Sequence, residues 1–218
     1  TKVMNEGCAT FVHHYITNAL YEQGLLTEGA MLEILHNHAN VVFQPGFDDP
    51  RYSGINPYAL GYAMMEDIRR ICTQPTPEDR EWFPDLAGSG DWRGTLRYAW
   101  ANYRDESFIR QYLSPSLIRK MKLFALADDG ESPYYTVGGI HDERGYRYIR
   151  DALAKSYDLA THEPDIQVVD VDLRGDRKLE LRHTMREGVP LAQPARDQVL
   201  QHVRLLWGYD VSLVSVEA

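Results

Sequence analysis

The chain has 218 residues and carries 32 acidic against 23 basic side chains, a formal net charge of −9. This length is enough for one large domain or two modest ones, and either could bury a sizeable core. The acidic balance argues against a nucleic acid partner, because phosphate binding needs a basic surface. No apolar run approaches the roughly 20 residues that cross a bilayer, so we expect no membrane insertion.

The first half of the chain shows the periodicity and capping signals of helices. A long irregular segment rich in proline, glycine and aspartate, residues 43–56, interrupts them. A loop of that length usually lines a site or is mobile. Helices are predicted over residues 2–24, from the Thr27 cap, from Asn56-Pro57 to Ile71, at the Thr76 to Asp79 capping box, over 91–103 and 106–113, and from Ser114-Pro115.

Around Leu123 the pattern changes from a helical to a strand-like period. The elements predicted there are a hairpin of 123–127 and 134–140 around the turn 128–130, a helix over 142–157, strands at 166–173 and 179–183, a helix from Pro194 to Gly208, and a strand at 209–216. From Tyr134 onward this order is that of the ferredoxin-like βαββαβ arrangement. We therefore predict an α+β chain, with a helical subdomain at 1–121 and a ferredoxin-like α/β sandwich at 122–218.

The first helix carries the best candidate for a functional site. At about 100° per residue, Glu6, Thr10, His13 and Thr17 form one narrow polar stripe between apolar flanks. A carboxylate and an imidazole would then face the interior together, which is costly unless they meet a partner or a metal. Glu6 and His13, joined by His38 of the second helix, are thus candidate ligands for zinc or another divalent metal.

A structural explanation competes with the metal site. A buried Glu–His pair is often only a hydrogen-bonded pair in the core, in which case Glu6 and His13 satisfy each other. His14 and His36 are expected to face solvent or a loop. The segment from Asn5 to Ala9 lacks the two histidines of the zinc-protease His-Glu-x-x-His helix. It looks instead like the second helix of gluzincin peptidases, and this likeness would make Glu6 a metal ligand.

Two further features bear on the protein as a whole. The chain begins inside a helical pattern with only Thr1 ahead of it as a cap, which predicts the C-terminal part of a longer protein whose upstream segment supplies further ligands. Cys8 and Cys72 lie in apolar helical settings. Buried free thiols in a reducing compartment explain them better than a disulfide does.

Several longer strings, in order along nearly the whole chain, resemble the SpoVR family, named for stage V sporulation protein R. They are MNEGCATF at 4–11, NVVFQP at 40–45, YSGINPYALG at 52–61, DIRRIC at 67–72, DESFI at 105–109 and VDLRGDR at 171–177. The resemblance implies a bacterial cytoplasmic protein linked to spore cortex formation. It also implies two protein partners, a PrkA-type serine kinase and a von Willebrand A-like protein, and it supplies no catalytic residues.

Two functional interpretations follow from the sequence. In the first, a SpoVR-like protein acts in sporulation or stress-linked envelope assembly, and its helical half carries a gluzincin-like, perhaps degenerate, site for a metal-dependent hydrolase. In the second, the protein has no chemistry and both halves bind partner proteins. Metal binding through Glu6 distinguishes the two.

Overall fold

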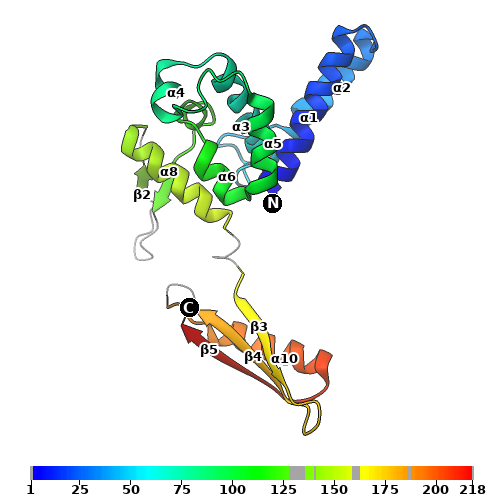
Figure 1. The fold of residues 1–218 in the computed structure, drawn as a ribbon, viewed down its shortest axis with the longest axis vertical. Helices are drawn as coiled ribbons and strands as arrows, with labels where there is room; N and C mark the ends of the chain where they lie inside the picture. The colour runs from blue at the N-terminus through cyan, green and yellow to red at the C-terminus, as the bar shows by residue number, and fades with distance from the viewer. Residues whose placement is uncertain (1, 128–135, 140, 159–162, 186–187, 218) are drawn as a thin grey trace. The chain divides into compact units, whose positions relative to one another are not determined.

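The computed structural model describes residues 2–127, 136–139, 141–158, 163–185 and 188–217. The chain divides into two compact units, Thr1–Tyr157 and Asp158–Ala218, which we call the helical unit and the C-terminal unit (Figure 1). No helix in the described part of the chain is long and apolar enough to cross a membrane. Each unit is described by itself below.

Helices make up most of the helical unit, and they begin where the sequence predicts. Thr27 accepts a hydrogen bond from Ala30 N, Asn56 from Tyr58 N, and Thr76 forms a capping box with Asp79. The elements are α1 Lys2–Glu22, α2 Glu28–Val41, α3 Pro57–Thr73, α4 Pro77–Trp82, α5 Trp92–Asn102, α6 Asp105–Tyr112, α7 Pro115–Lys120, β1 Ala125–Ala127, β2 Thr136–Gly139 and α8 Glu143–Ser156.

Helix α3 is the centre of the core of this unit. Leu60, Met64, Met65 and Ile68 have no exposed surface, and α1 packs against them along its length. Helices α5 to α8 add buried side chains to the same cluster. Because α3 presents apolar residues on most of its surface, helices on several sides can bury their own apolar stripes against it.

Helices α1 and α3 cross with their backbones in contact, at Gly7 and Gly61. A Cβ atom on Gly61 would lie 2.1 Å from Val3 O and 2.7 Å from Gly7 Cα. Only two glycines allow so close an approach. The glycine of the Asn5-Glu6-Gly7 motif therefore has a packing function, whatever the chemistry of the neighbouring glutamate.

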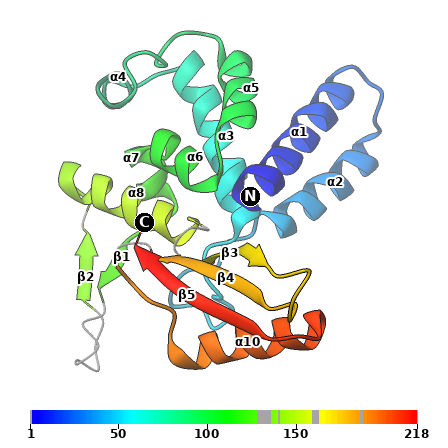
Figure 2. The ribbon, with the colours of Figure 1, turned by 60° about the horizontal axis from the view of Figure 1, so that its bottom comes forward.

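The C-terminal unit is a three-stranded sheet with a helix on one face (Figure 2). Its elements are β3 Asp165–Val171, β4 Leu179–Met185, α10 Gln193–Trp207 and β5 Val211–Glu217. The strand order is β3-β4-β5, with β3 antiparallel and β5 parallel to β4. Leu179, Leu181, Val211 and Leu213 form its small buried core. Val199, Val203 and Trp207 of α10 pack against this core.

The α+β class is confirmed, but the ferredoxin-like arrangement is not. Strand β2, expected as the first strand of the sandwich, pairs with β1 instead of joining β3 to β5. The following helix α8 buries Tyr146 and Ile149 in the core of the helical unit. The compact units consequently divide after Tyr157, whereas the predicted boundary is near residue 121. The predicted turn at 128–130 lies outside the described residues.

Candidate functional site

The buried stripe of α1 differs from the polar stripe that its sequence suggests. The residues that α1 buries include Val3, Gly7, Thr10 and Thr17. With His14 between the last two, these positions follow one another at intervals of three or four residues and therefore lie on one face of the helix. His13 lies about 100° away from His14 and is exposed. The expectation that Glu6 and His13 face the interior together is therefore wrong for His13, because the crossing at Gly7 sets which side of α1 meets α3.

Glu6 is half-buried and is oriented by a neighbour on α3. The Tyr58 hydroxyl donates a hydrogen bond to the Glu6 carboxylate, and this bond raises the pKa of Tyr58. The backbone carbonyl of Glu6 accepts a 2.6 Å bond from Thr10 Oγ1. Thr17 likewise donates to His13 O at 2.9 Å. The two threonines of the stripe thus donate their hydroxyl protons to backbone carbonyl groups within α1.

His38 belongs to a ring cluster with His14 and Tyr62, which joins α2, α1 and α3. The His14 and His38 rings stack with centroids 4.5 Å apart and an interplanar angle of 24°. Tyr62 meets both edge to face, at 5.5 Å from His14 and 4.7 Å from His38. Burial lowers the pKa of both histidines, and charge interactions between neighbouring imidazoles act in the same direction for His38.

The tautomer of His14 follows from its contacts. Its Nε2 lies 3.2 Å from Asn18 Nδ2, a group that can only donate, so Nε2 accepts. A neutral ring then carries its proton on Nδ1. This Nδ1 is buried and has no hydrogen-bond partner in the structure. The sequence reasoning missed His14, although its place in the series Val3, Gly7, Thr10, His14 and Thr17 was a usable signal.

The structure places the three predicted metal ligands in different settings and, within the described residues, does not group them. His13 is exposed, Glu6 bonds to Tyr58, and His38 stacks on His14. Among the described residues, no group of three or more His, Cys, Asp or Glu side chains is placed to hold a metal ion. We therefore derive no reaction step through a metal.

The irregular segment 43–56 lines a cavity. This agrees with the first of the two expectations for a loop of this length, that it lines a site. The cavity has a volume of about 1080 Å³ and lies between this loop, α3 and the segment after α7. Phe47 contacts Tyr52 and Phe124 edge to face in its wall, at 5.3 and 5.1 Å. A smaller polar hollow of about 330 Å³ adjoins the histidine cluster and is lined by His14, Glu66 and Arg69, among others.

A charged network beside the core explains the acidic residues of α3 structurally. Arg70 forms a bidentate pair with Asp79, at 2.6 and 2.8 Å, and bonds Asp67 at 2.8 Å. Burial would raise the pKa of Asp79, but hydrogen bonds from Arg70 and Thr76 outweigh it and the pKa is lowered. Asp67 also accepts a bond from Ser114, the cap of α7. These carboxylates hold three helices together and leave no free ligand.

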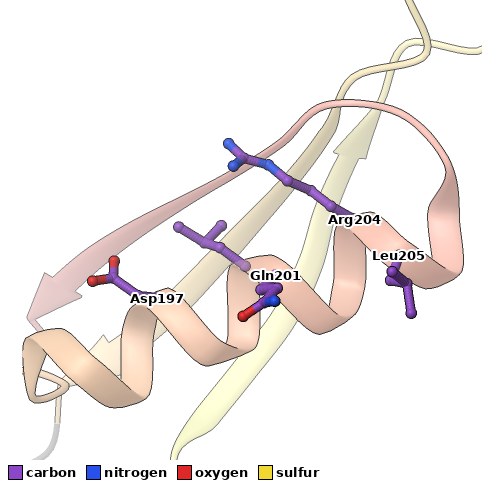
Figure 3. A pocket seen from close by; sticks show the side chains of 5 residues that line it. Asp197, Gln201, Arg204 and Leu205 are labelled. Carbon is purple, nitrogen blue, oxygen red and sulfur yellow. The ribbon is translucent and has the colours of Figure 1, made fainter.

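The C-terminal unit has a shallow groove along α10, with a volume of about 440 Å³. Leu200, with Asp197, Gln201, Arg204 and Leu205, forms its wall (Figure 3). In Figure 3, Arg204 extends toward the strands while Leu205 points away from them. Arg204 donates to Val211 O at 3.2 Å, and Arg196 to Leu213 O at 2.8 Å. Both arginines therefore donate hydrogen bonds to backbone carbonyl groups on the unpaired edge of β5. These bonds discourage another strand from pairing with that edge.

The two units of the fold define the class of protein to which this chain belongs. A helical unit built on a close glycine crossing is joined to a small α/β unit. The family of SpoVR like proteins matches residues 1–162, and the SpoVR-like C-terminal domain matches residues 164–218. The chain belongs to the SpoVR family.

A relative of known sequence supports this assignment. Over 213 residues the chain is 54% identical to the uncharacterized protein YcgB of Escherichia coli (strain K12). The match covers 98% of this chain and 41% of that protein, so the chain spans less than half the length of its relative. No solved structure matches the chain.

Proposed function

We propose that this SpoVR-family chain acts as a protein-binding component in sporulation or stress-linked envelope assembly, and that its C-terminal unit is the docking module. The family resemblance suggests the partners, a PrkA-type serine kinase and a von Willebrand A-like protein. A cytoplasmic location follows from the same resemblance. The spore cortex is the corresponding site of action in sporulating species.

One observation on the C-terminal unit carries this proposal. Leu205 and Leu206 are adjacent on α10 and are 82% and 86% exposed. No side chain of this helix is buried, and the buried core of the described part of the unit consists of four residues. So small a core leaves the unit short of buried apolar area. Exposing two neighbouring leucines to water costs free energy, and burial against a partner surface would recover it.

The test uses the whole chain and the two purified partners. In a pull-down or by calorimetry, wild-type protein is expected to retain the kinase or the von Willebrand A-like protein, and the double variant Leu205→Ser, Leu206→Ser to lose it. His202→Ser is the matched control, because His202 is an exposed polar residue on the same helix. An undiminished complex with the double variant, or no complex with folded wild type, contradicts the proposal.

A second candidate function keeps the metal interpretation for Glu6. The observation that favours it is the Tyr58 hydroxyl, which bonds the half-buried Glu6 carboxylate and would orient it. The remaining ligands would come from residues beyond this chain, with His13 and His38 as further candidates. Metal analysis of the intact natural protein, purified without chelator and compared with Glu6→Ala, tests this. Equal metal content in the two folded proteins excludes Glu6 as a ligand.

A further inference from the structure

A half-buried arginine on α8, Arg150, forms no ion pair with any of the described residues. The Nε and Nη2 atoms of Arg150 are buried and have no hydrogen-bond partner among the residues that the structure describes. Its Nη1 makes one long bond of 3.4 Å, to the carbonyl oxygen of Arg110. The guanidinium carbon lies 4.9 Å from the centre of the Trp82 ring and 5.7 Å from that of Phe83.

The nearest carboxylates form their ion pairs with other arginines. Asp151 pairs with Arg110 at 3.4 Å, and Glu143 pairs with Arg147 at 3.0 Å. Burial lowers the pKa of Arg150 to about 10, the charge of Arg147 acts in the same direction, and the charge of Asp151 opposes both. The side chain is therefore still a cation at pH 7. A largely covered cation without an ion pair costs free energy, and an oxyanion beside the guanidinium would supply the counter-charge.

A cavity adjoins this arginine. It has a volume of about 580 Å³, within the range of small-molecule sites. Its wall includes a second cation, Arg110, and polar groups of Thr95, Tyr98 and Gln111. Asp85 also lines the cavity, but within the described residues it forms no ion pair with either arginine. The cationic groups of the wall therefore outnumber the acidic one, although the chain as a whole carries a net charge of −9.

We propose that this cavity is a binding site for a small oxyanion, a carboxylate or a phosphate group, and that Arg150 is its principal ligand-binding residue. The planar fork of a guanidinium matches both groups, which accept two parallel hydrogen bonds. Arg110 adds charge from the adjacent helix α6, and the rings of Trp82 and Phe83, which also line the cavity, lie against the Arg150 guanidinium. The site is separate from the histidine cluster and from α10, and it is independent of the proposed docking function.

Thermal unfolding at constant ionic strength tests this site with two probes, inorganic phosphate and malonate, each against chloride. At least one probe is expected to raise the midpoint of the wild type. Arg150→Met should lose that rise, and its apparent affinity by calorimetry should fall about tenfold or more. Arg147→Met is the matched control, because Arg147 also lies over the Trp82 ring, at 4.8 Å, but is exposed. This control should keep the wild-type response.

A second measurement separates a ligand site from a structural cation. In chloride alone, Arg150→Met should be at least as stable as the wild type, because the substitution removes an unpaired buried charge and keeps the apolar packing. A large loss of stability in chloride overturns the proposal. So does an equal rise with phosphate and malonate in Arg150→Met and wild type, which would mean an adventitious ion only. The absence of any rise in the wild type overturns it as well.

Discussion

The crossing of α1 and α3 gives the sharpest prediction for stability. In Gly61→Ala the new methyl group would lie 2.1 Å from Val3 O and 2.7 Å from Gly7 Cα, so the helices must separate by about an ångström. Overpacking of this kind costs about 1–3 kcal/mol and occasionally more. The higher helix propensity of alanine returns about 1 kcal/mol at most. Because the contact is between two backbones and no side chain can rotate away, we place the cost at the upper end of this range and expect a net loss of about 2 kcal/mol.

Urea unfolding followed by circular dichroism measures this loss. Gly29→Ala is the matched control, because Gly29 is also helical and a Cβ there would meet nothing within 4 Å. The control should be neutral or slightly stabilised by alanine's helix propensity. If Gly61→Ala is as stable as Gly29→Ala, α1 and α3 do not cross at Gly61 with their backbones in contact.

Three further predictions concern charged and titrating groups. Arg70→Met leaves the Asp79 carboxylate buried without its partner, and we expect a loss of about 3 kcal/mol in the free energy of unfolding. Asp105→Ala removes the carboxylate that accepts bonds from two N–H groups in the first turn of α1, at 3.1 and 2.9 Å, and should cost about 1–2 kcal/mol. Because the folded protein lowers the pKa of His14 and His38 below 6.5, the unfolded chain binds more protons below that pH. Stability should therefore fall as the pH drops from 7.5 to 5.5.

Each of these predictions has a result that contradicts it. For Arg70, the loss should shrink at low pH, because the lowered pKa of Asp79 stabilises the fold only above the pH range where the unfolded aspartate is protonated. A pH-independent loss would point to another cause. For Asp105, unchanged amide exchange at the start of α1 would exclude the capping function. For the histidines, NMR titration midpoints at or above 6.5 would contradict their burial.

The local structure of the helical unit could be predicted from the sequence because its signals are short-range. Thr27, Asn56, Thr76 and Ser114 cap helices within three residues of themselves, and the structure places a helix after each. The same holds for the strands of the C-terminal unit, apart from shifts at their ends. The assignment of β2 and α8 to a sandwich failed, because element order does not say which core an apolar stripe will join.

The candidate site illustrates the same difference. Sequence alone indicated Glu6, because its place depends on the spacing of residues along one helix. The stacking of His38 on His14, the exposure of His13 and the unpaired charge of Arg150 depend on how helices cross. That geometry is set by contacts between residues far apart in the chain, such as the approach of Gly7 to Gly61 in the case of the α1 histidines. The sequence therefore determined the elements and the family, and only the tertiary structure decided which side chains meet.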